Sequence, residues 1–132
     1  MITTALVERN SEGTFFIFTP DLKDFTIMGT GDTVVEAMSD FETSVQEVIE
    51  SYASVSLPEE LQDFKWEYRY DLGSLFDYYS FINVSALAKR IGINPSLMRQ
   101  YKRGQYISKE QMGKIEKALR EIGTELSAVS LT

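Results

Sequence analysis

The chain of 132 residues contains no cysteine and no histidine. Without cysteine it can form neither a disulfide framework nor a thiolate metal site or nucleophile. Without histidine it lacks the side chain that most often serves as general base and metal ligand. We therefore expect a protein that is not an enzyme, with no catalytic residues, no metal site and no cofactor.

Long apolar runs are also missing. No run approaches the stretch of about 18 apolar residues that a membrane-spanning helix requires. The N-terminus shows no basic segment followed by an apolar one, so a secretory signal is not expected. Hydrophobic residues nevertheless make up 43% of the chain, which is enough for a packed core. These features predict a cytoplasmic protein without a membrane partner.

Charge is divided unevenly along the chain. Residues 1–83 carry 4 basic and 16 acidic residues, a net charge of −12, whereas residues 84–132 carry 9 basic and 4 acidic residues, a net charge of +5. The two parts together give the net charge of −7 of the whole chain. An acidic half joined to a basic half suggests two partners of opposite charge. The alternative is that small domains simply vary in charge.

The acidic half has the pattern of a small sheet with one helix. Three stretches rich in β-branched and aromatic residues predict strands at 2–9, 14–18 and 25–28, the last followed by a loop at 29–32. Thr33 and Glu36 form a capping box at the start of a helix of about five turns. Its apolar stripe falls at steps of three and four residues. The stripe consists of Val34, Met38, Phe41, Val45, Val48 and Tyr52.

Residues 64–71 predict a fourth strand, because aromatic and charged side chains alternate strictly there. We expect the aromatic side chains to pack under the helix stripe, although a base-stacking platform is the alternative interpretation.

The stretch 14–18 is apolar on both faces, so either both faces are covered or one awaits a partner. The order β-β-β-α-β predicts a small antiparallel sheet with one helix, in a domain covering residues 1–72.

The pattern of the basic half predicts helices. Gly73 marks the expected boundary, Ser74 is expected to cap a short helix, and an all-α domain is expected over residues 73–132. Near its end, Ser108 caps a closing helix whose stripe contains Met112, Ile115, Leu119 and Ile122. Gly123 is expected to end that helix.

Residues 83–104 predict two short helices joined by a glycine turn. Asn83 can cap the first helix by accepting a hydrogen bond from a backbone N–H. Ala88 is small enough for the two helices to cross closely. Gly92 stands where the first helix must stop, because glycine adopts the left-handed conformation at little cost. Ile93 is expected to fill the corner between the helices.

The second helix has the pattern of a DNA-reading helix. Asn94 and Pro95 suit its N-cap and first helical position. Leu97, Met98 and Tyr101 share the inner face, and the candidate base-contacting residues Ser96, Arg99, Gln100 and Arg103 share the outer face. Arginine can bind guanine and glutamine can bind adenine through two hydrogen bonds each. Lys89, Arg90 and Lys102 are the candidate phosphate-contacting residues.

This pair of helices resembles the helix-turn-helix of phage-repressor-like DNA-binding proteins. The resemblance implies that residues 95–103 form a recognition helix that lies in the major groove. The alternative is an ordinary helical hairpin whose basic residues are solvated.

The stretch 20–37, PDLKDFTIMGTGDTVVEA, is similar to the signature of HicB-type antitoxins. The matching parts are Pro-Asp-Leu at 20–22, Gly-Asp-Thr at 31–33 and Glu-Ala at 36–37. Within them we interpret five residues as turn and cap residues and not as contact residues: Pro20, Asp21, Asp32, Thr33 and Glu36. The expected β-β-β-α-β order, which resembles a partial ribonuclease-H-like fold, extends the likeness over about residues 1–71. The helix-turn-helix fits one branch of the same family, so the resemblance covers nearly the whole chain.

The resemblance implies a toxin–antitoxin role. The acidic domain would bind and inhibit a small basic ribonuclease toxin of the HicA type, and the basic domain would bind operator double-stranded DNA and repress the operon. Repressor-like units usually bind DNA as symmetric dimers, so a homodimer or a higher even oligomer is expected, with half-sites about 34–36 Å apart.

Two rival hypotheses remain. A ribonuclease-H-like sheet could carry metal-dependent hydrolysis through Asp21, Asp24 and Asp32, but these residues fall in turns and no histidine or cysteine supports them. The other rival is a transcriptional regulator whose N-terminal domain senses a small molecule or another protein. Nothing in the composition excludes this regulator.

Overall fold

The computed structural model describes residues 2–132. The chain divides into two compact units, a sheet unit that ends at Ser80 and a helical unit, Phe81–Thr132. The sheet unit therefore extends to Ser80, beyond the boundary expected after residue 72. All the acidic excess lies in the sheet unit and all the basic excess lies in the helical unit, since residues 81–83 carry no charge.

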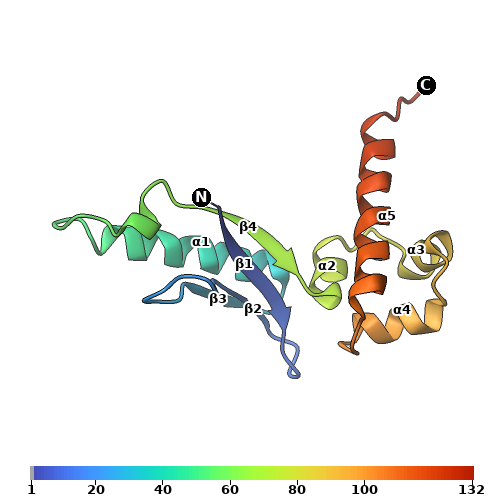
Figure 1. The fold of residues 1–132 in the computed structure, drawn as a ribbon, viewed down its shortest axis with the longest axis horizontal. Helices are drawn as coiled ribbons and strands as arrows, with labels where there is room; N and C mark the ends of the chain where they lie inside the picture. Colours follow the sequence, from blue (N-terminus) through green and yellow to red (C-terminus); the bar gives the residue numbers. More distant parts are fainter. Residues whose placement is uncertain (1) are drawn as a thin grey trace. The chain divides into compact units, whose positions relative to one another are not determined.

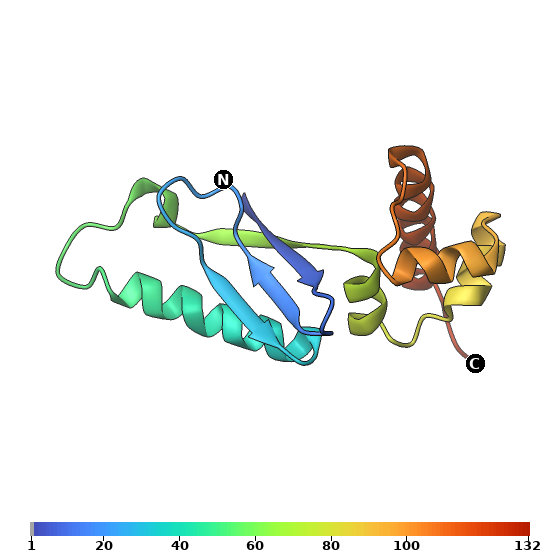
Figure 2. The same cartoon turned by 90° about the horizontal axis from the view of Figure 1, so that it is seen from below.

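Between residues 2 and 80 the sheet unit contains four strands in the order β3-β2-β1-β4 (Figure 1). The strands are β1 (Ile2–Arg9), β2 (Phe15–Phe18), β3 (Met28–Gly31) and β4 (Lys65–Tyr70). β1 pairs with β2 and β2 pairs with β3 in antiparallel orientation, whereas β4 runs parallel to β1. The helix α1 (Val34–Glu50) connects β3 to β4 and covers one face of the sheet (Figure 2).

The expected fold class is wrong in two respects. The sheet is mixed, because β4 runs parallel to β1. Parallel strands need a long crossover connection, and here α1 provides it between β3 and β4. The helices are also interleaved with the strands, and α2 (Leu72–Tyr78), which would open the expected all-α domain, belongs to the sheet unit. Only the short stretch Phe81–Thr132 remains after that unit. Over residues 2–132 the chain is an α+β protein with a four-stranded mixed sheet and five α-helices.

α1 packs on the sheet as its apolar stripe predicts. Val34, Ala37 and Phe41 are fully buried, and Ala5 and Val7 of β1 lie in the same core. The Thr33 side chain accepts a hydrogen bond from the Glu36 N–H at 3.1 Å, which confirms the predicted N-cap. The Glu36 carboxylate accepts from the Asp32 N–H at 3.0 Å, so the capping box is shifted by one residue from its usual form.

The third strand lies later in the chain than expected. Residues 25–27 are outside any strand, and the glycine-containing segment expected to be a loop forms β3. Glycine suits this strand because α1 passes very close to it. A Cβ atom on Gly29 would lie 2.4 Å from the Phe41 backbone nitrogen, and one on Gly31 would lie 2.6 Å from the Ala37 backbone nitrogen. These two residues set the distance between helix and sheet.

Among residues 2–80 no helix covers the opposite face of the sheet. Phe15 and Ile17 point into the core, whereas Phe16 and Phe18 are partly exposed and Met28 is exposed. Of the two possibilities open from the sequence, the structure thus shows one face of β2 without a covering layer. On β4 the aromatic side chains face α1, with the Phe41 and Trp66 ring centroids 5.5 Å apart, which confirms the core interpretation.

α2 begins differently from the expectation. Asp71 is its N-cap and accepts a hydrogen bond from the Ser74 N–H at 2.8 Å. Ser74 itself is fully buried within the helix, and its hydroxyl oxygen has no hydrogen-bond partner among residues 2–132. The aspartate at the end of β4 therefore terminates the strand and starts the helix.

The helical unit consists of α3 (Val84–Ile91), α4 (Pro95–Lys102) and α5 (Lys109–Ser127). Its small core contains Leu87, Ala88, Ile93, Met98, Tyr101 and Ile115. α5 begins after the predicted cap Ser108 but continues through Gly123, where it was expected to end. Within residues 2–132 no helix is both long enough and apolar enough to cross a membrane.

Candidate nucleic-acid interface

The turn between α3 and α4 is built from the residues that the sequence predicts for it. The Asn83 side chain accepts a hydrogen bond from the Ala86 N–H at 2.9 Å, and that of Asn94 accepts from the Ser96 N–H at 2.8 Å. Gly92 has a φ of +88°, the left-handed conformation that glycine tolerates best. Both helices of the pair are therefore capped at their N-termini by short polar side chains.

The inner face of the helix pair fixes which residues remain outside. Ala88 and Met98 are completely buried, and Ile93 closes the corner between the helices at 5% exposure. Leu97 is only partly buried. Because these residues hold α4 in one rotation about its own axis, its opposite face is presented to solvent.

All four candidate base-contacting residues are exposed. Ser96, Arg99 and Gln100 belong to α4, while Arg103 is its C-cap residue. Their spacing of three, one and three residues places them along one side of the helix. The set therefore forms a continuous polar strip with two guanidinium groups and one amide.

Arg99 is oriented by two hydroxyl groups. Its guanidinium donates to the Ser85 Oγ of α3 at 3.2 Å and to the Ser96 Oγ at 3.1 Å. A guanidinium has five N–H donors, so further donors remain for an acceptor outside the chain. Ser85 was not predicted as a site residue. Ser85 lies 14 residues before Arg99, and no sequence pattern indicates that the two side chains form a hydrogen bond.

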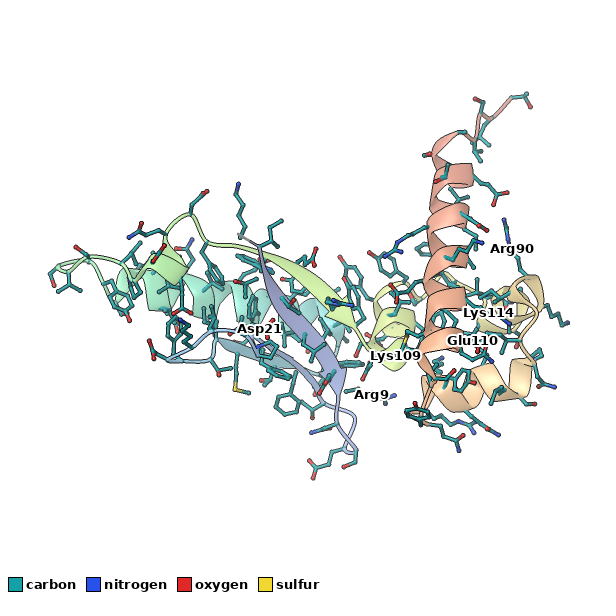
Figure 3. All side chains as sticks on the ribbon, in the orientation of Figure 1. Arg9, Asp21, Arg90, Lys109, Glu110 and Lys114 are labelled. Atoms are coloured by element: carbon teal, nitrogen blue, oxygen red, sulfur yellow. The ribbon has the colours of Figure 1, made fainter. Side chains whose placement is uncertain are left out.

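The three candidate phosphate-contacting residues divide into two kinds. Lys89 and Lys102 are exposed at the last turns of α3 and α4. Arg90 instead forms an ion pair with Glu125 of α5 (Figure 3 labels Arg90). Arg90 thus connects α3 to α5 and would have to leave Glu125 before contacting a phosphate.

α5 adds cations that the sequence reasoning did not include. Lys109 and Lys114 lie on the first turns of this helix (Figure 3), and both are exposed. Glu110 lies between them. Their positive charges belong to the same compact unit as the α4 strip, which raises its electrostatic attraction for a polyanion.

A second charged surface lies on α1 of the sheet unit. Glu36, Asp40, Glu42, Glu47 and Glu50 are exposed, and α1 has no lysine or arginine. Asp40 accepts a hydrogen bond from the Thr30 N–H at 2.8 Å, and Glu36 caps its own helix. The remaining three carboxylates point toward solvent and are available to a cationic partner.

The aspartates considered for catalysis are not gathered at one place. Asp21 (labelled in Figure 3) and Asp24 lie in the connection between β2 and β3, and Asp32 lies between β3 and α1. Among residues 2–132 no group of three or more acidic side chains is placed to share a metal ion.

No protein-family model, no curated protein and no solved structure matches this chain. The resemblance to HicB-type antitoxins therefore depends on the quoted residues alone.

Proposed function

We propose that this protein is an antitoxin that binds a small basic ribonuclease of the HicA type and represses its own operon by binding operator DNA. The observation that carries the proposal is the separation of charge between two compact units, −12 in residues up to Ser80 and +5 in Phe81–Thr132. Each unit carries a net charge opposite to that of its proposed partner. The residues quoted from the HicB-like signature supply the class of the partner.

The DNA-binding part of the proposal is supported by α4. Its outer strip combines arginine and glutamine, which can each recognise a base edge in the major groove through two hydrogen bonds. Lys89 and Lys102 at the helix ends have the charge and exposure that phosphate contacts need. Such units usually act in pairs, so we expect two copies to occupy half-sites about 34–36 Å apart.

The toxin-binding part is supported by the acidic surface of α1. Glu42, Glu47 and Glu50 form an exposed anionic surface on a rigid helix. A ribonuclease must attract RNA phosphates with basic groups, so an anionic surface can compete with the substrate for these groups. Association driven in this way is fast at low salt and weakens as salt is added.

The decisive experiment separates the two activities in one protein. Arg99→Ala with Gln100→Ala should weaken binding to operator DNA, measured by fluorescence anisotropy, while leaving inhibition of the ribonuclease unchanged. Each lost base contact costs about 1–3 kcal/mol, so the dissociation constant should rise at least about 30-fold. Lys117→Ala, which also removes one exposed cation, is the matched control and should change DNA affinity far less.

The neutralising activity is tested with the product of the adjacent reading frame, which we expect to be a small basic ribonuclease. A triple variant should inhibit the ribonuclease less than the wild type does, while its DNA binding should be unchanged. The three substitutions are Glu42→Gln, Glu47→Gln and Glu50→Gln. A chain that binds DNA but forms no complex with the neighbouring gene product would refute the antitoxin assignment. Loss of inhibition in the Arg99 and Gln100 double variant, with folding intact, would show that the two surfaces are not independent.

One observation favours the regulator as a second candidate. The uncovered sheet face carries a shallow hollow of about 230 Å³ lined by Glu8, Arg9, Asn10, Phe16, Phe18 and Met28. It combines apolar side chains with one acidic and one basic residue, Glu8 and Arg9, and it is smaller than the range of about 300–1,000 Å³ typical of ligand pockets. A small metabolite that changes operator affinity in the wild type but not in Phe16→Ala would support this alternative.

A further inference from the structure

β4 is an edge strand whose outer side is open. It is the last strand of the sheet, and among residues 2–132 no other strand pairs with its free side (Figures 1 and 2). The Asp71 N–H donates to the Val7 carbonyl of β1 at 3.1 Å. Backbone groups alternate in direction along a strand, so those of Trp66, Tyr68 and Tyr70 point away from β1. These N–H and C=O groups form an unpaired hydrogen-bonding edge.

The other edge of the same sheet is treated differently. The outward N–H of Thr30 in β3 donates to the Asp40 carboxylate at 2.8 Å. A side chain of α1 thus occupies the edge of β3, which is one of the ways in which proteins prevent further strand addition. β4 has no proline and is longer than β3, and in the part of the chain from Ile2 onward no carboxylate is described as bonded to its outward N–H groups.

The charged side chains of β4, together with Asp71 directly after it, alternate in sign along the face opposite the aromatic side chains. Lys65, Glu67, Arg69 and Asp71 follow one another at every second position, in the order positive, negative, positive, negative. A second copy of this strand that runs antiparallel and is centred on Tyr68 places Glu67 opposite Arg69 at two equivalent positions. The same register places Lys65 opposite Asp71, whose carboxylate already caps α2 and so contributes at longer range.

We propose that two copies of this chain associate by antiparallel pairing of β4 with β4, centred on Tyr68, so that the two sheets become one. In this register Tyr68 meets Tyr68 of the second copy and Trp66 meets Tyr70 as hydrogen-bonded pairs, which uses every outward backbone group of the strand. Registers centred on Glu67 or on Arg69 place like charges opposite each other and are disfavoured.

The aromatic face of β4 gains from the same arrangement. Trp66, Tyr68 and Tyr70 are only partly buried in one copy, although they already contact the core or one another. The Trp66 and Tyr68 ring centroids lie 6.4 Å apart, and those of Tyr68 and Tyr70 lie 6.5 Å apart. Pairing extends this ladder across the two-fold axis, and cross-strand aromatic pairs stabilise antiparallel strands.

This self-association is a property of the sheet unit alone. It requires neither the ribonuclease nor DNA, and its measurement is separate from both. If the helical units also associate on operator DNA, the β4 contact joins such pairs into larger even assemblies. Failure of the β4 contact therefore leaves the proposed antitoxin activity open to its own tests.

Cross-linking tests the register directly, because the natural chain has no cysteine. Glu67→Cys chains mixed with Arg69→Cys chains should form a disulfide, since opposed residues of a non-hydrogen-bonded pair have Cα atoms about 4.5 Å apart, within disulfide range. Each variant alone should not, because its cysteines are then diagonal neighbours about 7–8 Å apart. Glu47→Cys mixed with Arg69→Cys is the control and should remain unlinked. No disulfide in the mixture, or equal cross-linking of a single variant, overturns the proposal.

Charge exchange gives an independent test by sedimentation of the full chain. Glu67→Arg places arginine opposite arginine at both positions and should raise the dissociation constant of the assembly by about tenfold or more. Arg69→Glu should have a similar effect, and combining the two substitutions should restore the wild-type assembly. Identical sedimentation of the wild type and both single variants at every concentration would overturn the proposal.

Discussion

Gly29→Ala is the most informative test of how the sheet unit is held together. The added methyl group would lie 2.4 Å from the Phe41 backbone nitrogen and 2.6 Å from the Ala37 carbonyl oxygen. Normal contacts between such atoms are above about 3.4 Å. The obstacle is the backbone of α1, which cannot rotate away as a side chain can. α1 must therefore move off the sheet by about 1 Å.

The expected cost follows from this displacement. Overpacking a core usually lowers the free energy of unfolding by about 1–3 kcal/mol, and a clash with a helix backbone belongs at the upper end of that range. Moving α1 also loosens the contacts of Phe41, which is fully buried. With a urea dependence of about 1–3 kcal/mol per molar, the unfolding midpoint should fall by about 1 M or more.

The assay uses the one tryptophan of the chain, Trp66, whose ring packs edge-on against Phe41. Its fluorescence reports the unfolding of the sheet unit. Gly123→Ala in α5 is the matched control, since nothing lies within 4 Å of the position of its Cβ. That substitution should raise helix stability by about 1 kcal/mol, measured by circular dichroism. An unchanged midpoint for Gly29→Ala would show that the close contact of α1 with β3 does not exist in solution.

Further predictions concern single groups. Ser74→Ala should raise the free energy of unfolding by about 1 kcal/mol in urea titration, because it removes a buried hydroxyl without a partner. Burial raises the pKa of Tyr70 above its ordinary value of 10.0, so stability should fall as the pH rises above that value, and Tyr70→Phe should flatten this loss in alkaline denaturation. Glu125→Gln should release Arg90 for a phosphate contact and steepen the salt dependence of DNA binding by about one unit of slope, whereas the charge-matched Glu121→Gln should not.

Local patterns in the sequence predict most of the elements. The α1 stripe and the alternation of β4 are periodic, and each period matches the geometry of only one kind of element. The caps at Thr33, Asn83 and Asn94 could also be predicted, because a short polar side chain satisfies a neighbouring N–H. Such signals operate within four residues and need no knowledge of the rest of the chain.

Elements that depend on distant neighbours could not be predicted in this way. The glycines of β3 favour the prediction of a loop. They are nevertheless required in this strand, because the backbone of α1 passes too close to it for a Cβ atom. The parallel direction of β4 follows from the crossover through α1, which no local pattern records. In the same manner the sequence assigns Arg90 to DNA, whereas its partner Glu125 lies 35 residues away.

Arg99 differs from the other candidate base-contacting residues in how its side chain is held. Exposure alone is not sufficient, since an arginine free in solvent loses its rotational freedom when it binds. Hydrogen bonds to Ser85 and Ser96 already restrict its guanidinium while leaving donors free. Gln100, Lys102 and Arg103 share its exposure, but among the bonds described for residues 2–132 only Arg99 of this helix is held by a side chain of α3. Arg99 is therefore the residue of α4 on which specificity for an operator base should depend most strongly.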